Sequence, residues 1–475
     1  MMQKQKNLIP IFIGLMASLL IYAMDSTVFS TAMKKIVQEI GGGAWYSWPF
    51  TSYMLCSTVI IPIAGAISDS LGHKPVFLTG ILGFLLGSAL CGFSQNMAQL
   101  ILFRAVQGIG GGIIVSGVFT LVADLFPPAE RGQYTGIMSS MYGLANIIGP
   151  LAGGIIADRL TWRWIFYLNL PVGLTAFFLL CFKLPRFLPE NKKKADRAGM
   201  TLLVLALTPL LLALSLAGNL FAWNSAPILL MLIGSAVMLV LLGITQRRAE
   251  NPVLPPEFFT DRRINMSLAV SFLNQITMIG TVIYLPYFEQ YVLKMSATVS
   301  GIVLAPMMVS LVLAGNLTGL LISKTGKCGV WSVTGFVFSG IGIALLSAMN
   351  ENTSSFSLIA FAVLIGIGAG MNMPVGNVNA QNSVPKSRIG SVTSAVTFAR
   401  NVGTASGSAL FGAVLTLARA SGSADLRALR TVFLAGIPVA AFGILCALLL
   451  RDASPEQQEA KQPDPFKKCD EVSAQ

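Results

Sequence analysis

Charged side chains are scarce in this sequence. Only 11% of its 475 residues are Asp, Glu, Lys or Arg, whereas 54% are hydrophobic. A soluble domain usually carries about 25% charged residues, so the composition excludes an ordinary soluble enzyme and indicates a lipid bilayer as the solvent. The 32 basic residues outnumber the 20 acidic ones but lie in short clusters between apolar runs, which argues against a nucleic-acid partner.

Histidine and paired cysteines are also lacking. The chain has one histidine, His73, and six cysteines that are scattered without disulfide or metal-site spacing. These residues give no material for a histidine-based metal site or a catalytic triad. The polar segment 451–475 is too short for a catalytic or signalling domain. We therefore expect no enzymatic activity, no metal and no cofactor.

Long apolar runs are what the chain has in abundance. A helix needs about 20 mostly apolar residues to cross a membrane, and helices satisfy their own backbone groups in lipid. We therefore predict an all-α polytopic membrane protein, in which the first run is a retained membrane helix and not a signal peptide. The fourteen runs lie near residues 8–31, 46–68, 75–95, 98–123, 133–157, 163–183, 199–220, 226–246, 264–288, 299–322, 330–349, 356–380, 390–416 and 431–450.

The basic residues predict how the chain is oriented. With the N-terminus in the cytoplasm, 22 of the 32 Lys and Arg residues fall in segments on the inner side and 8 in segments on the outer side. Cytoplasmic loops of membrane proteins are enriched in Lys and Arg, and an odd number of helices would spoil this agreement. We expect a multi-pass protein of the bacterial cytoplasmic (inner) membrane with both termini in the cytoplasm.

An internal repeat predicts the domain organisation. GAISDSLG at residues 65–72 is similar to GLLISKTG at 319–326, and GIGGG at 108–112 is similar to GIGAG at 366–370. Parallel repeats of this kind are typical of transporters with a binding site between two halves. The predicted parts are an N-terminal six-helix bundle (1–183), basic loops with two inserted helices (184–263), a C-terminal six-helix bundle (264–450) and a polar cytoplasmic tail (451–475).

Four segments together carry a family resemblance: GAISDSLGHK (65–74), LILFRAVQGIGGG (100–112), YGLANIIGPLAGG (142–154) and WRWIFYLNLPVG (162–173). They resemble the major facilitator superfamily, specifically its fourteen-helix drug:proton antiporter branch. The resemblance covers nearly the whole chain. It implies the major facilitator fold and proton-driven export by alternating access.

The first segment resembles the signature of the cytoplasmic loop between the second and third membrane helices. The family usually has basic residues where this chain has Ser70 and His73, so the remaining lysine is expected to carry more of the pattern. A simple loop turn is the alternative. The resemblance assigns a cytoplasmic gate to Gly65, Asp69, Gly72 and Lys74.

The third and fourth segments predict packing features. The third resembles the helix that marks exporters, with a small-residue face for close packing on the opposite half; ordinary glycine packing is the alternative. In the fourth, Trp162, Trp164 and Tyr167 are expected to anchor the chain at the membrane interface. The predicted antiporter-helix residues are Gly143, Gly149, Pro150, Gly153 and Gly154.

Asp25 and Arg104 are the expected site of proton coupling. Each lies about six residues from the outer end of its helix, roughly 9 Å below the outer surface at 1.5 Å per residue. An arginine at this depth costs about 2.5–3.5 kcal/mol on insertion scales, so Arg104 is expected to face protein or a wet cavity. The two side chains are therefore expected to meet, and the resemblance associates this arginine with proton transfer.

Two interpretations of this pair remain open. In the first, Arg104 or a cationic substrate favours ionised Asp25, and protonation of Asp25 displaces the substrate. In the second, the pair is a permanent structural salt bridge. Proton-driven transport that persists at the normal rate in Asp25→Asn would exclude the first interpretation.

A polar substrate cavity is expected in the second half. Its centre is Arg400, in the middle of an apolar run, where the family also has an arginine. Hydrogen bonding between helices is the alternative role for each asparagine. Glu289, at the outer end of the ninth run, either attracts cations or is a solvated interface acid. The other predicted cavity residues are Asn274, Gln275, Asn316, Asn372 and Asn401.

The leading functional prediction is a proton-coupled secondary active exporter of amphipathic drugs or related organic compounds. Its expected partners are a small organic substrate, protons and the lipid bilayer; we expect a monomer that uses the proton gradient and no cofactor. The alternative is a dedicated exporter of one metabolite, antibiotic, lipid or siderophore. A remote alternative is a membrane sensor on a transporter-like scaffold.

Overall fold

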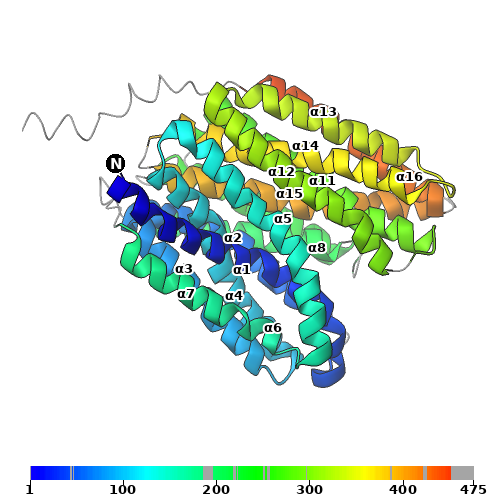
Figure 1. Ribbon diagram of the computed structural model, residues 1–475, viewed down its shortest axis with the longest axis horizontal. Helices are drawn as coiled ribbons and strands as arrows, with labels where there is room; N and C mark the ends of the chain where they lie inside the picture. Colours follow the sequence, from blue (N-terminus) through cyan, green and yellow to red (C-terminus); the bar gives the residue numbers. More distant parts are fainter. Residues whose placement is uncertain are drawn as a thin grey trace, which may run out of the picture.

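The computed structural model shows a chain built from long helices packed side by side (Figure 1). It describes residues 2–42, 45, 48–185, 196–217, 221, 223–249, 252–253, 257–295, 297–385, 388–420 and 425–450. The first helices are α1 (Met2–Ile40), α2 (Trp48–Leu71), α3 (His73–Phe93), α4 (Met97–Leu125), α5 (Pro128–Arg159), α6 (Trp164–Tyr167) and α7 (Asn169–Lys183).

Nine further helices follow along the chain. Two of them, α8 (Arg197–Leu216) and α9 (Ala226–Gln246), correspond to the predicted insert. The remaining seven are α10 (Glu257–Thr260), α11 (Arg262–Tyr291), α12 (Ala297–Thr325), α13 (Cys328–Ser347), α14 (Ser355–Ser383), α15 (Ile389–Ala420) and α16 (Asp425–Leu448).

Each of the fourteen predicted apolar runs falls largely within described helices. Among the described residues, thirteen helical segments are long and apolar enough to cross a membrane, with α6 and α7 counted as one. The 32-residue α5 runs beside them and packs on α1 and α12. The outermost helix, α9, exposes Leu230 and Val240 by 70% and 62%, as expected for side chains that face lipid. The all-α polytopic fold is confirmed.

Particular residues mark where several of these helices begin. Gly72 separates α2 from α3 with a φ of 95°, a left-handed conformation that other residues rarely adopt. The Asn96 side chain accepts from the backbone N–H of Gln99 at the start of α4, and the Asp196 side chain accepts from Gly199 at the start of α8.

Each half has its own buried apolar core. Leu19 of α1, Phe84 of α3 and Phe119 of α4 belong to one cluster. Leu285 of α11 and Phe411 of α15 belong to another, in the second half. We call the face on which α1 begins and α16 ends the terminal face, and the opposite one the far face.

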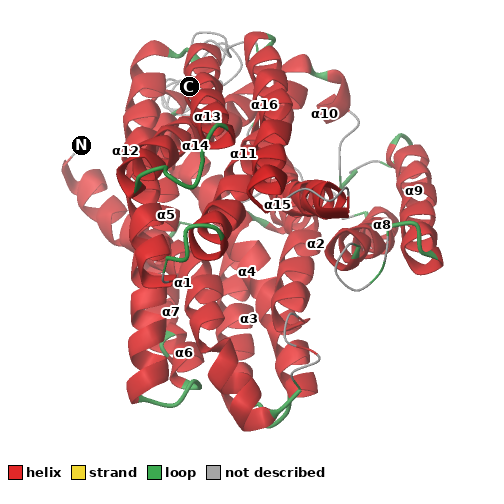
Figure 2. Cartoon of the chain, turned by 90° about the vertical axis from the view of Figure 1, so that its right-hand side faces the viewer, coloured by secondary structure: helices red, strands yellow, loops and turns green. Residues whose placement is uncertain are grey.

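Two seams join the halves. Along one, α5 lies on α12; along the other, α2 lies on α15. Helix α8 covers the second seam: its Leu207 and Leu211 pack with Ile63 of α2, and Ala405 of α15 packs against the same cluster. Figure 2 shows α8 and α9 on one side of the two bundles, with α9 outermost. The insert is therefore a cover over one seam.

Trp162, predicted as an interface anchor, is buried against its neighbours. Its ring is only 1% exposed, and its Nε1 donates to Glu39 Oε2 at 2.9 Å. Arg163 pairs with the same carboxylate and lies 4.4 Å above the Trp162 ring. The hydrogen bond from Arg163 holds the pKa of the Glu39 carboxyl below its usual range. Trp164, 52% exposed, fits the interface instead.

Candidate functional site

A buried ion pair joins α1 to α4 inside the first half. Asp25 and Arg104 are in direct contact, and both side chains are 0% exposed. Two further donors reach the carboxylate: Gln107 Nε2 at 2.8 Å and Asn169 Nδ2 at 3.3 Å, both to Oδ1. The structure thus brings Asp25 and Arg104 together, and the carboxylate faces protein rather than lipid.

The Arg104 guanidinium is held from several sides. Its Nη1 also donates to Gln107 Oε1 at 2.9 Å, and its Nε donates to the Pro49 carbonyl of α2 at 3.4 Å. Its Cζ lies 4.6 Å from the ring centroid of Phe29 and 4.2 Å from that of Tyr53, so cation–π attraction adds to the ion pair. These contacts link the pair to α2.

Gln107 and Asn169 were missed in the sequence. Gln107 lies three residues after Arg104, and residues at this spacing share a helix face. That signal was present in the second of the four motif segments. Asn169 lies within the fourth segment and also donates to Ser88 Oγ at 3.0 Å, so this segment contributes to the site as well as to anchoring.

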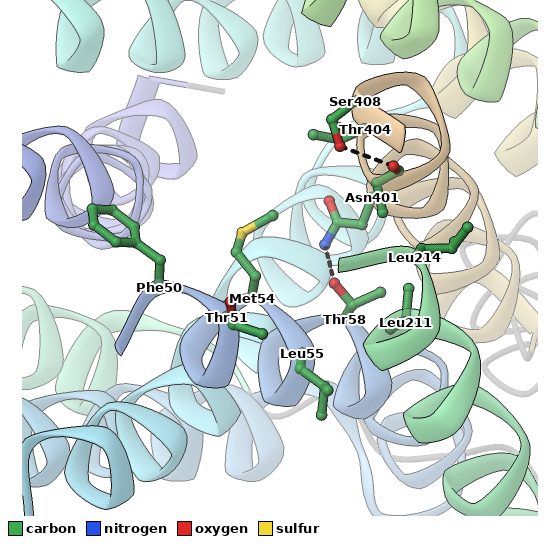
Figure 3. Close-up of a pocket in the computed structure, with 11 residues that line it drawn as sticks. Phe50, Thr51, Met54, Leu55, Thr58, Leu211, Leu214, Asn401, Thr404 and Ser408 are labelled. Carbon is green, nitrogen blue, oxygen red and sulfur yellow. Dashed lines mark hydrogen bonds between the residues drawn. The ribbon is translucent and has the colours of Figure 1, made fainter. Parts of the chain in front are cut away.

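A cavity of about 200 Å³ lies between the two halves (Figure 3). Its walls come from α2, α15 and the inserted α8. None of the eleven lining residues that the structure describes carries a charge. Asn401 Nδ2 donates to Thr58 Oγ1 at 3.2 Å across the cavity wall. The lining residues are Phe50, Thr51, Met54, Leu55, Thr58, Leu211, Leu214, Asn401, Thr404, Ala405 and Ser408.

Aromatic rings separate the ion pair from this cavity. Phe50 lines the cavity and packs on Phe29, with ring centroids 4.7 Å apart. Phe29 in turn covers the Arg104 guanidinium. Asp25 lies behind these rings and is not among the lining residues. Direct competition between substrate and proton for this carboxylate is therefore not supported by this arrangement.

Five of the six residues assigned to the polar cavity of the second half do not line the cavity of Figure 3. Gln275 donates to Thr404 Oγ1, a lining residue, at 3.1 Å. The Arg400 Cζ lies 5.8 Å from the ring centroid of Phe119 in α4. Among the six residues assigned to it, only Asn401 lines the described cavity.

The three remaining asparagines bond elsewhere. Asn274 donates to the Ala369 carbonyl at 3.3 Å, and Asn316 donates to Val312 of its own helix at 2.9 Å. Asn372 accepts from Ser332 Oγ at 2.6 Å. Hydrogen bonding within and between helices, the alternative role, accounts for all three.

Glu289 is also placed differently from either sequence-based alternative. Both alternatives assumed an exposed carboxylate at the outer end of α11. The side chain is fully buried, with 0% of the residue exposed. The interpretation as a solvated interface acid is wrong, because this end of α11 is covered by neighbouring helices.

The predicted gate residues lie where the two halves meet on the terminal face. The Asp69 carboxylate, near the end of α2, accepts from Gly390 N at 2.9 Å, Ser391 N at 2.8 Å and Ser391 Oγ at 2.5 Å. These donors are the first groups of α15, where a helix carries partial positive charge. We call this contact between Asp69, Gly390 and Ser391 the latch.

The other gate residues differ in whether they contact the latch. A Cβ at Gly65 would lie 2.8 Å from the Gly390 carbonyl and closer still to Ser394, so only glycine fits there. Lys74 does not pair with Asp69: its Nζ donates to the carbonyls of Cys181 and Leu184, at 2.8 and 2.5 Å, at the end of α7. The expectation that Lys74 replaces the missing basic residues is wrong.

His73 takes that place instead. Its Nε2 lies 3.1 Å from Asp69 Oδ1 and its Nδ1 lies 2.5 Å from Asp124 Oδ2 of α4. Nothing in the sequence favours His73 over Lys74, because both follow Gly72 and only packing decides which side chain turns inward.

Glycines line the seam between α5 and α12. A Cβ at Gly143 would collide with Val312 and lie 3.2 Å from the Met308 carbonyl. Gly136 faces Gly315 in the same way: a Cβ at Gly136 would lie 2.9 Å from the Gly315 carbonyl oxygen. Gly149 is buried. The prediction for the antiporter helix also includes three positions whose surroundings lie outside the described part of the structure, namely Pro150, Gly153 and Gly154.

Comparisons with known proteins agree on one family. The sequence model of the Major Facilitator Superfamily matches residues 15–408 and 333–471. The multidrug transporter protein MdtP of Bacillus subtilis is 36% identical over 413 residues, which cover 87% of this chain and 76% of that protein. Efflux pump FUS6 of Gibberella fujikuroi is 33% identical over 414 residues, which cover 85% of this chain and 74% of the pump.

Solved structures share the fold. The proton:xylose symporter XylE superimposes with a TM-score of 0.68 at 15% identity, over 97% of this chain and 100% of the symporter. The human organic anion transporter MFSD10 gives a TM-score of 0.63 at 16% identity, over 94% and 99%. The helices, the two seams and these matches lead to one conclusion: the chain belongs to the Major Facilitator Superfamily and is a multi-pass membrane transporter related to multidrug transporters and efflux pumps.

Proposed function

We propose that this transporter is a proton-coupled exporter of amphipathic organic compounds, which works by alternating access between its two halves. The observation that carries the proposal is the buried pair of Asp25 and Arg104 beside a cavity between the halves. The family relationship to multidrug transporters and efflux pumps supports export.

Protonation of Asp25 would remove the negative charge of this pair. Removing one partner of a buried ion pair costs about 3–5 kcal/mol, because the other charge is left uncompensated. Moving a two-state equilibrium from 1:99 to 99:1 takes about 5.5 kcal/mol. A single proton at Asp25 is therefore of the right size to drive most of a conformational change.

The coupling to substrate is proposed to run through α2. Arg104 donates to the Pro49 carbonyl, and the next residue, Phe50, lines the cavity. Tyr53, under the guanidinium, lies one turn further along the same helix. A shift of Arg104 on protonation of Asp25 would move this part of α2 and so reshape the cavity without contact between substrate and Asp25.

The lining of the cavity favours neutral amphipathic substrates. Hydroxyl and amide groups of Thr58, Thr404 and Asn401 stand among apolar side chains, and burying an unpaired charge there would be costly. The cavity is smaller than the roughly 300–1,000 Å³ of a typical ligand site, so it must widen to load a drug-sized compound. Exchange of one proton for a neutral substrate gains about 2.3 kcal/mol per 100 mV in addition to the pH difference.

The terminal face is proposed to lie in the cytoplasm of a bacterium, with the protein acting as a monomer in the cytoplasmic membrane and using no cofactor. Contacts between the halves hold this face together: the latch, Arg131 Nη1 to Asn382 Oδ1 at 3.2 Å, and Gln381 Nε2 to the Phe119 carbonyl at 3.1 Å. The cavity lies nearer the far face, since Phe50 is in the first turn of α2. This arrangement supports a conformation closed toward the cytoplasm.

A transport assay tests the function. The purified protein is reconstituted in proteoliposomes and given matched pairs of neutral and cationic amphipathic compounds, with and without an imposed pH gradient. We expect several unrelated neutral compounds to accumulate only with the gradient, and collapse of the gradient by an ionophore to abolish accumulation. Equal transport without a gradient would contradict proton coupling, and transport of one compound alone would favour the dedicated exporter.

A further inference from the structure

His73 lies between two carboxylates at the terminal face. Its Nδ1 is 2.5 Å from Asp124 Oδ2 and its Nε2 is 3.1 Å from Asp69 Oδ1. The three side chains come from α3, α4 and α2, and their exposed fractions are 11%, 10% and 8%. Water therefore has little access to the cluster in this conformation.

The geometry requires a proton that a neutral imidazole does not have. An ionised carboxylate only accepts hydrogen bonds, whereas a neutral imidazole has one N–H and one bare nitrogen. Two ring-nitrogen contacts to two carboxylates need two hydrogens. One additional proton must therefore be present, on the ring or on a carboxyl group that it faces.

The cluster shares Asp69 with the latch. Asp69 accepts from His73 and, at the same time, from the first groups of α15 in the other half. Without the additional proton, the bare Nε2 would face Asp69 Oδ1. Two acceptors would then face each other, so the contact between His73 and Asp69 would break.

The surrounding charges are few. Asp69 of α2 and Asp124 of α4 face the ring directly. Arg131 of α5 is in electrostatic contact with Asp124 and donates to the Ala123 carbonyl at 2.9 Å. Lys74, the next residue of α3, turns to the end of α7. The ring is thus the basic group that stands between the two acids.

We propose that His73 is a second proton-binding site, which takes up a proton when the latch closes and releases it when the latch opens. In the closed conformation, loss of the proton would leave two poorly hydrated negative charges beside a neutral ring. Opening admits water, which solvates both carboxylates, and an exposed imidazole titrates near pH ~6.5. A proton bound preferentially in the latched state stabilises the latch as the pH on the terminal face falls.

This inference rests on the proposed alternating access, but its role differs from that of Asp25. The His73 proton enters and leaves on the same face, so it carries no net transport. It biases the transporter toward the conformation closed at the terminal face when that compartment is acidic, and toward the open conformation when it is alkaline.

The test measures the latch itself and needs no transport. Spin labels are placed on Leu71→Cys of α2 and Lys324→Cys of α12, on the terminal face of the two halves, in a full-length background free of native cysteines that still transports. Distances are recorded between about pH 6 and pH 10. The latched fraction is expected to fall with rising pH. The ratio of latched to open protein should change by up to about tenfold per pH unit, because one proton is bound.

Three variants make the measurement specific. His73→Arg, always charged, is expected to stay latched across the range and lose the pH dependence. His73→Gln, never charged, is expected to be less latched at every pH. Lys74→Gln, which removes a charge from the next residue, is expected to keep the wild-type profile. A wild-type profile without pH dependence, or the same profile in His73→Arg, would overturn the proposal even if proton-driven transport is found.

Discussion

At the scale of single residues, the geometry around Asp25 explains why one carboxylate in an apolar helix is tolerated. It has an ion pair with Arg104 and two amide donors, Gln107 and Asn169. A buried charge with fewer partners would be expensive. The amides keep the carboxylate in place whether or not the guanidinium moves, so they are expected to set how easily the proton is bound.

Gln107→Ala tests this role. The change removes the donor to Asp25 Oδ1 and the acceptor for Arg104 Nη1, and an unsatisfied buried polar group costs about 1–3 kcal/mol. We expect the pH optimum of transport to shift and the proton-driven rate to fall roughly five- to a hundredfold. The pH–rate profile in proteoliposomes measures both effects.

Gln95→Ala is the matched control, because Gln95 is exposed just before α4. It is expected to leave the pH profile unchanged. An unchanged profile in Gln107→Ala would mean that Gln107 is a packing residue with no part in proton binding.

The sequence predicted the depth of polar groups better than their direction. Asp25 and Arg104 were matched by their distance from the membrane surface, and the structure brings them into contact. Counting residues gives height along a helix axis, but the direction in which a side chain points depends on which helices pack around it. Asn372 and Glu289 were misplaced for this reason, because both point into helix contacts rather than toward a cavity or solvent.

At the scale of helices, the fold could be predicted because each membrane helix needs its own apolar run. What could not be predicted was the role of the insert. In the sequence, the leucines of α8 do not differ from those of any other membrane helix. In the structure, Leu211 and Leu214 form a wall of the cavity. Only the packing of α8 over the seam of α2 and α15 distinguishes them.

Leu214→Trp tests the wall. The larger ring is expected to fill part of a cavity of about 200 Å³, so the KM for bulky substrates should rise several-fold while that for small ones changes little. Leu205→Trp is the control, because Leu205 is 51% exposed on the same helix and does not line the cavity. Equal effects of the two variants on all substrates would contradict a role for α8 in substrate selection.

The seam between α5 and α12 depends on the absence of side chains. A Cβ at Gly319 would collide with the Gly132 carbonyl oxygen and lie 3.1 Å from its carbon. Backbone atoms cannot turn aside as a side chain can, so Gly319→Ala is expected to separate the two helices. We expect a loss of about 1–3 kcal/mol in stability, the usual cost of overpacking, seen as a lower midpoint of thermal unfolding in detergent.

Gly234→Ala on α9 is the comparison for that variant. A Cβ there meets nothing within 4 Å, and alanine is the better helix former. Its unfolding midpoint is expected to be unchanged or higher. A Gly319→Ala protein as stable as Gly234→Ala would show that the close approach at this seam is not required.

At the scale of the whole molecule, two buried or half-buried carboxylates, Asp25 and Asp69, lie where the proposed movement would act. The Asp25 pair lies within one half, next to the helix that lines the cavity, and the latch joins the halves on the terminal face. Small residues, such as the glycines of α5 and α12, make close contacts between the halves as well. Such surfaces can separate and re-form at little electrostatic cost.

The central claim is that Asp25 binds the proton that drives export, and one comparison tests it most directly. Wild type and Asp25→Asn are reconstituted side by side, and each is assayed for exchange of labelled substrate at equal pH and for accumulation driven by a pH gradient. We predict that Asp25→Asn keeps exchange but loses accumulation, because the halves still alternate without a proton to couple. Accumulation by Asp25→Asn at the wild-type rate would contradict the account.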